Sequence, residues 1–139
     1  MWDEISTGIG VLLATVSDLN SDTIFNYRKS SFDKYPAVTY YPENGDGEFA
    51  DTMRTQRSYV FQLNVYQERV EKAASDVESI MRGRIDDLIT LFDSNKYLDS
   101  NRLQGRGFIR PIPSRWDLIQ GEQVDVLRAQ ILLMAVVIQ

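Results

Sequence analysis

The C-terminal segment, Val124–Ile138, limits the possible folds more than any other part of the chain. Its apolar residues alternate with the two-residue period of a β-strand, and from Leu132 onward both faces of that strand are apolar. A strand of this length spans about 50 Å, whereas a chain of 139 residues folds into a domain only about 37 Å across. One possibility is that the strand bends sharply. A second is that it extends beyond the globule and offers unpaired backbone groups to another subunit. The third possibility is that the strand is a few residues shorter at its ends.

The rest of the chain predicts two helices and three further strands. Apolar residues recur at helical spacing over 2–16 and 70–92, and the segments predicted as strands are 23–28, 37–41 and 56–67. The polar stretch 43–55 contains Asn-Gly-Asp-Gly-Glu, which is typical of a turn. Pro111 and Pro113 predict that 93–122 is irregular and that any strand within it lies at a sheet edge. We therefore expect one α+β domain, residues 1–139, in which a mostly antiparallel sheet with long strands is flanked by two helices.

Composition excludes several classes of enzyme. The chain has no His and no Cys, so it can form no Ser-His-Asp triad, no thiolate nucleophile, no disulfide and no His/Cys zinc site. Its formal net charge is −5, which disfavours a protein that grips nucleic-acid phosphates. The acidic N-terminus and the short apolar run Ile131–Ile138 predict a soluble protein made in a cytoplasm, with no membrane partner.

Three short motifs lack the spacing or geometry that a functional site needs. Gly8-Ile-Gly10 lacks both the third glycine and the preceding strand of a dinucleotide loop. Asp46, Glu48 and Asp51 do not have the ligand spacing of a calcium loop. Asp86 and Asp87 point about 100° apart on a helix, which prevents them from sharing a proton. We predict no catalytic residues, no cofactor and no metal ion.

Arginine is the residue type that suggests a contact surface. The chain has 11 Arg and only 4 Lys, and Arg suits planar, two-pronged pairing with carboxylates at interfaces. Ordinary surface salt bridges are an equally good explanation. Candidates for contacts between subunits, or with a larger partner, lie in the 43–57 loop and in the Arg-rich 102–115 segment; they are Phe49, Arg54, Arg57, Arg106, Arg110 and Arg115.

The order of these segments resembles the phage tail-terminator (tail completion) family. The likeness is carried by the N-terminal helix that ends near Val16, the strand Tyr35–Tyr40, and the polar loop Asn44–Gly47. It continues with Tyr59–Tyr66, which leads directly into an Ala- and Glu-containing helix, and with the C-terminal Asp125–Ala129 strand. The likeness covers nearly the whole chain, and it lies in the order of the segments and in their general residue character.

The resemblance implies a non-enzymatic virion protein that forms a ring, typically a hexamer, on the last ring of the tail tube. Such a ring halts tube polymerisation and presents a docking face to the connector or neck of the head, while DNA passes through its channel without being specifically bound. Its partners would be copies of itself, the tail tube protein and the head–tail connector. It would reside in the virion, and in the host cytoplasm during assembly.

Two alternatives remain open from the sequence. A head-completion or neck connector protein would bind the portal side and need not stop tube growth. A monomeric α+β binding module or carboxylate-based enzyme would instead have a closed apolar pocket with convergent acids of perturbed pKa.

Overall fold

Five strands form a single sheet in the order β1-β2-β3-β5-β4. The computed structural model describes residues 1–49, 55–69, 74–119 and 125–138. Every neighbouring pair of strands is antiparallel except β1 and β2, which are parallel. The elements are α1 (Trp2–Leu13), β1 (Ile24–Phe25), β2 (Ala37–Phe49), β3 (Thr55–Arg69), α2 (Ala74–Ser94), the short 3₁₀ helix η1 (Asp99–Asn101), β4 (Gly107–Ile119) and β5 (Asp125–Ile138). The predicted α+β class is confirmed.

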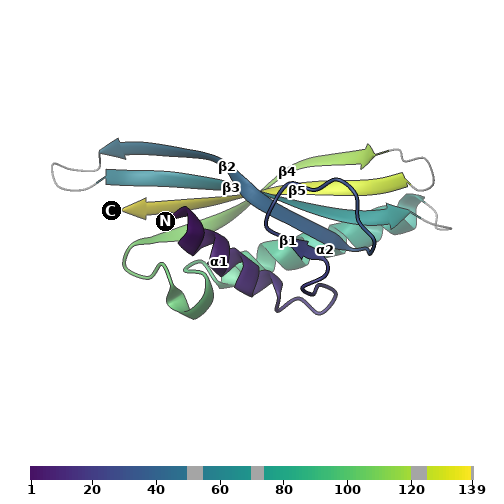
Figure 1. Cartoon of the computed structure of the whole chain (residues 1–139), viewed down its shortest axis with the longest axis horizontal. Coiled ribbons are helices and arrows are strands. Elements are labelled where there is room, and N and C mark those ends of the chain that lie inside the picture. Colours follow the sequence, from purple (N-terminus) through teal and green to yellow (C-terminus); the bar gives the residue numbers. More distant parts are fainter. Residues whose placement is uncertain (50–54, 70–73, 120–124, 139) are drawn as a thin grey trace.

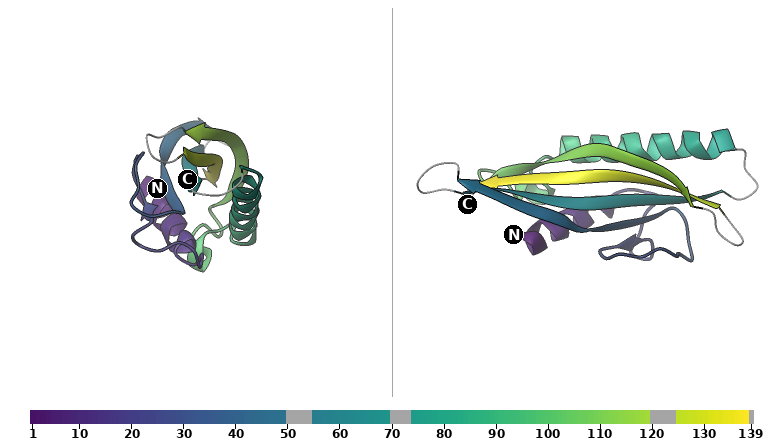
Figure 2. Two further views of the ribbon diagram at one scale, coloured as in Figure 1. Left: turned by 90° about the vertical axis from the view of Figure 1, so that its right-hand side faces the viewer. Right: turned by 90° about the horizontal axis from the view of Figure 1, so that it is seen from above.

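Both helices cover the same face of the sheet, which we call the helix side (Figure 1). Viewed end-on in Figure 2, the sheet arches over the two helices. The alternation predicted for the C-terminal strand is confirmed, since every second residue of β5 is buried; these are Leu127, Ala129, Ile131, Leu133, Ala135 and Val137. Burying side chains of this size contributes about 1.5–3 kcal/mol for each large one.

Each helix presents an apolar stripe to this core. In α2 the buried residues recur every three or four positions, and they are Val77, Met81, Ile85, Leu88 and Phe92. In α1 the stripe is Ile5, Ile9, Leu12 and Leu13. Trp2 meets Tyr59 and Phe61 of β3 edge-to-face, with ring centroids 4.7 and 5.4 Å apart. Packing against the sheet therefore holds α1 in place, although Gly8 and Gly10 lower its intrinsic helix propensity.

The long strands are confirmed: β3 has 15 residues and β5 has 14. The paired ends of β2 and β3 extend beyond the helices (Figure 1), so part of the sheet projects from the helical body.

Three boundaries differ from the sequence-based expectation. The predicted strand 23–28 is reduced to Ile24–Phe25. The Asn-Gly-Asp-Gly-Glu stretch was predicted as a turn, but it continues β2, because pairing with β3 beyond an irregularity at Pro42/Asn44 outweighs local turn preference. The segment predicted to be irregular contains β4, a strand of 13 residues. It does lie at the sheet edge, where prolines are tolerated.

Candidate assembly surface

The face of the sheet opposite the helices carries an apolar patch. The even-numbered residues of β5 point to this helix-free side, and β4 residues paired with them share it. Near the C-terminal end of β5, Phe108, Ile112 and Ile138 are exposed at 38–41% of their surface. The partly buried residues between them are Val60, Leu132, Met134 and Val136. We call these seven residues the apolar patch.

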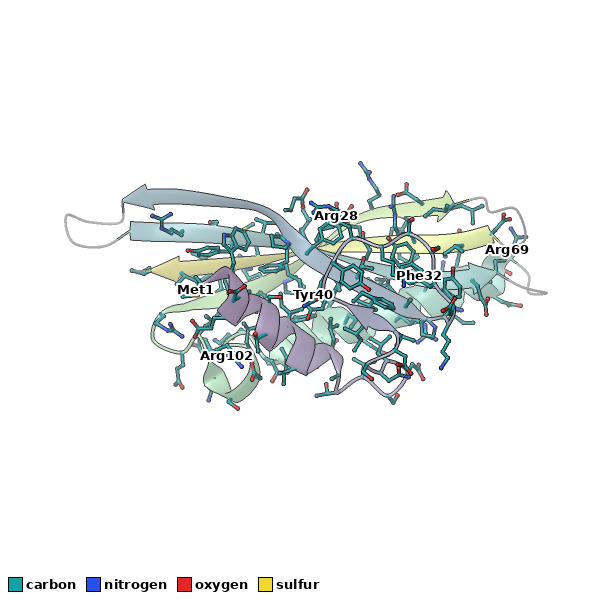
Figure 3. All side chains as sticks on the ribbon, viewed as in Figure 1. Met1, Arg28, Phe32, Tyr40, Arg69 and Arg102 are labelled. Carbon is teal, nitrogen blue, oxygen red and sulfur yellow. The ribbon has the colours of Figure 1, made fainter. Side chains whose placement is uncertain are left out.

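The other end of the helix-free side is covered by the chain itself. Residues 26–35, which we call the strap, run from β1 to β2. Phe32 of the strap packs on Tyr66 with ring centroids 4.6 Å apart, and the guanidinium of Arg28 lies 4.4 Å from the ring of Tyr41. Figure 3 labels Arg28 and Phe32 in this segment. Because the strap covers only this end, the apolar patch is left open.

A buried polar group lies beneath the strap. The side-chain amide of Asn64 donates to the hydroxyls of Thr39 and Tyr41, at 3.3 and 3.0 Å. Gln62 donates to the side-chain oxygen of Asn64 at 3.1 Å. Since buried polar groups must be hydrogen-bonded to be tolerated, this network fixes β2 against β3 and has a structural role.

Arg128 and Asp117 form an ion pair between β5 and β4 on the same face. The hydrogen bonds that Arg128 donates to Asp117 and to the Tyr66 hydroxyl raise the pKa of Arg128, although burial opposes the shift. This pair joins the outer strand β4 to the centre of the sheet close to the strap.

The predicted contact arginines divide into two groups. Arg110 and Arg115 are exposed on β4 and paired with Met134 and Gln130, which places both on the helix-free side beside the apolar patch. Arg57 is exposed on β3 but lies on the helix side. Within the described part of the chain, none of these three arginines makes an ion pair.

Arg106, by contrast, is used within the chain. It pairs with Glu4 at the start of α1 and donates to the backbone carbonyl of Arg102. The hydrogen bond from Arg106 lowers the pKa of Glu4. Arg102 makes a two-pronged contact with Asp99, each hydrogen bond being 2.8 Å, and this contact lowers the pKa of Asp99. These pairs fasten the η1 corner to α1.

Two predicted candidates cannot be placed in the same way. Phe49 is the last residue of β2, and its side chain is not described. Arg54 lies outside the described residues. Prediction from the sequence missed the exposed Phe108 and Ile112 on the helix-free side and Leu118 on the helix side, because it treated 93–122 as irregular and assigned these residues to no strand.

The principal hollows of the described surface are not closed pockets with convergent acids. Two depressions of about 420 and 510 Å³ share Tyr97 and Phe108 in their linings, and together they contain one carboxylate, that of Asp93. A groove with two acids, Asp18 and Asp87, has a volume of about 70 Å³, well below the ~300 Å³ of a small-molecule site. Its Arg84 is already paired with Asp18 at 2.8 Å.

Among the described residues, no three or more acidic side chains lie close enough together to hold a metal ion. In the same residues, neither helix is long and apolar enough to cross a membrane. The chain matches no protein-family model, and no curated protein has a significantly similar sequence.

Proposed function

We propose that this chain is a structural ring subunit that caps the tail tube of a bacteriophage or prophage, the role of a tail terminator. The ring stops tube polymerisation and forms the docking face between the tail and the neck of the head. It is non-enzymatic, and its partners are copies of itself, the tail tube protein and the head–tail connector. The proposed location is the virion, and the host cytoplasm during assembly.

The observation that carries the proposal is the open apolar patch beside Arg110 and Arg115. Exposed apolar surface rimmed by free charges is the usual composition of a protein–protein contact. The patch lies on a broad sheet face without an enclosed cavity, which suits a large protein partner better than a small molecule. We assign this face to the contact with the tail tube.

Charge supports the proposed passage of DNA. Each subunit has a formal net charge of −5, so a ring of several copies is strongly acidic. Proteins bind phosphate backbones through clusters of Lys and Arg, and a protein whose Lys and Arg are outnumbered by acids has a low affinity for nucleic acid. A ring of this protein therefore lets DNA pass without holding it.

Electron microscopy of growing tail tubes tests the proposal directly. Purified tube protein is polymerised with and without this chain, and the tube lengths and tube ends are measured. We expect shorter tubes with a ring of extra density at one end. The variant Ile112→Glu, in the patch, should abolish capping, whereas Val11→Glu on the exposed side of α1 should not; both residues are exposed by a similar fraction, 39 and 45%.

The same experiment separates the alternatives. A chain that binds heads or portal rings and leaves tube length unchanged is a head-completion protein. A chain that stays monomeric and binds neither tubes nor heads contradicts the proposed role altogether.

A further inference from the structure

The first half of the β4 edge has no hydrogen-bond donor to offer another strand. β4 is the outermost strand, so alternate residues direct their backbone N–H away from the sheet. The N–H of Ile109 points outward, and it is already bonded to the carbonyl of Lys96 at 2.7 Å. Pro111 and Pro113 occupy the next two outward positions and have no N–H. Strand addition along 107–113 is therefore blocked.

The second half of the same edge is open. The N–H of Ile138 bonds to the carbonyl of Arg106, so even-numbered residues of β5 direct their N–H groups toward β4. After the irregularity at Pro113/Arg115, those even residues pair with 115, 117 and 119. The backbone groups of Trp116 and Leu118 must then point away from the sheet. Both side chains are exposed, at 43 and 49%. We call 115–119 the open β4 segment.

The opposite edge of the sheet also has a blocked part followed by an open part. The N–H of Val38 bonds outward to Thr23 next to β1, and Pro42 occupies an outward position of the same series. Beyond the irregularity at Pro42/Asn44 the pairing shifts by one residue, which makes 45, 47 and 49 the outward positions. Two of these are Gly45 and Gly47. We call 45–49 the open β2 segment.

Each chain thus has two open edge segments at opposite ends of the sheet, one on the outermost strand β4 and one on the part of β2 that lies beyond its pairing with β1. A ring needs two different surfaces on every subunit, one for each neighbour. Because β4 runs antiparallel to β2, two sheets placed edge to edge with their helices on the same side meet as an antiparallel pair. The geometry of the edges therefore suits a second copy of this chain.

We propose that the open β4 segment of one subunit pairs antiparallel with the open β2 segment of the next, with Trp116 opposite Gly47 and Leu118 opposite Gly45. Trp116 and Leu118 pair with Ala129 and Leu127, and the two glycines pair with Arg57 and Tyr59. All four positions belong to the helix side of the sheet. In this register both large side chains lie across from both glycines.

The glycines support this pairing independently of the edge geometry. Glycine inside a strand weakens the strand, and it is commonly found where another chain approaches closely. A large side chain on the neighbouring strand covers the backbone that a glycine leaves exposed. The prolines limit the pairing to a few residues, so a single contact is weak and closure of the ring is needed for a stable assembly.

This inference rests on the proposed function only in taking a copy of the same chain as the partner. Leu118→Pro tests it, because the substitution removes an outward N–H and leaves the β4–β5 hydrogen bonds in place. We expect folded protein by circular dichroism, and at least a tenfold higher concentration for half-assembly by sedimentation velocity. Val11→Ala, on the exposed side of α1 and outside both open segments, should assemble like the unmodified chain. Assembly of folded Leu118→Pro at the unmodified concentration overturns the pairing.

Cysteine cross-linking tests the register without a destabilising change, since the chain has no native Cys. A chain with Leu118→Cys and Gly45→Cys, treated with a short thiol cross-linker, should give a ladder of covalent oligomers. A chain with Ile112→Cys and Gly45→Cys should remain a single band. Equal ladders, or no ladder from the first pair, contradict the register.

The outcomes distinguish this pairing from the proposed function. In one outcome the unmodified chain assembles, Leu118→Pro assembles equally well, and the Leu118→Cys/Gly45→Cys chain gives no ladder. That result overturns the pairing and leaves the capping ring intact. Assembly through these edges by a protein that never binds tubes overturns the tail function and leaves the pairing intact. A strict monomer that still caps tubes overturns the pairing and the proposed ring, and leaves only the capping role.

Discussion

Replacing Gly10 with Ala should destabilise the protein, although helix propensity alone predicts the reverse. A Cβ atom added at Gly10 would lie 2.5 Å from the hydroxyl oxygen of Tyr40 and 3.6 Å from the ring carbon that carries it. The first distance is a severe overlap, and Tyr40 is only 6% exposed and has little room to move. Overpacking of this kind costs about 1–3 kcal/mol, whereas Gly→Ala in a helix gains up to about 1 kcal/mol. The expected net loss is up to about 2 kcal/mol.

The same Gly10→Ala change should have the opposite effect in a protein that also carries Tyr40→Phe. Without the hydroxyl, the nearest atom to the new Cβ is the ring carbon at 3.6 Å, an ordinary van der Waals contact. Gly10→Ala should then stabilise the protein by up to about 1 kcal/mol. The sign of the effect therefore reverses, and the coupling energy of the double-mutant cycle is about 1–3 kcal/mol. Tyr40→Phe has its own cost of about 1 kcal/mol, because the hydroxyl is hydrogen-bonded to Ser6.

Urea unfolding at one low protein concentration measures all four corners of the cycle. Gly83→Ala is the matched control, because a Cβ at Gly83 meets nothing within 4 Å and should gain the full helix propensity of about 1 kcal/mol. If Gly10→Ala stabilises the Tyr40 protein as much as Gly83→Ala does, α1 is not seated on β2 as described. The packing argument would then fail.

Three further predictions concern the core, the η1 corner and the response to acid. Phe92→Ala, at a fully buried site, should cost about 3–5 kcal/mol in urea unfolding; a cost below 1 kcal/mol would show that α2 does not fill the core. Ser100→Val should cost about 1 kcal/mol, because Ser100 has a φ of 49° that β-branched residues disfavour, and an unchanged midpoint would contradict that backbone conformation. The pKa values of Glu4 and Asp99 are lowered by their arginine partners, so their stabilisation is present above the unfolded values near ~4 and is lost as the pH falls through the lowered folded values. Glu4→Gln and Asp99→Asn should each flatten the acid limb of unfolding free energy against pH, and an identical limb would show that the pairs do not form.

The sequence predicted those parts of the fold that follow from periodicity. The stripe of α2 and the alternation of β3 and β5 are strong because each element buries one whole face. β4 was missed because Pro111 and Pro113 are usually signs of irregular chain. They cost the sheet nothing where they stand, since their missing N–H groups would have pointed away from β5.

The candidate surface could be predicted only in part. Arg110 and Arg115 were identified as contact residues, and they lie on one exposed strand beside apolar neighbours. Those neighbours were not identified, because exposed apolar residues form a patch only after strand pairing has placed them together. Gly45 and Gly47 gave a local turn signal, and only long-range pairing with β3 shows that they belong to a strand.

The order of the strands also constrains how the chain folds during its synthesis. β5 lies between β3 and β4, yet it is made after both, and among the described strands it alone pairs with β4. Until residues 125–138 leave the ribosome, β3 has one open flank and β4 has no strand beside it. During that interval the unpaired edges of β3 and β4 can bind other chains, unless the ribosome or a chaperone at its exit shields them. Strains with limited chaperone capacity should therefore lose this protein to inclusion bodies sooner than a protein whose central strand is made first.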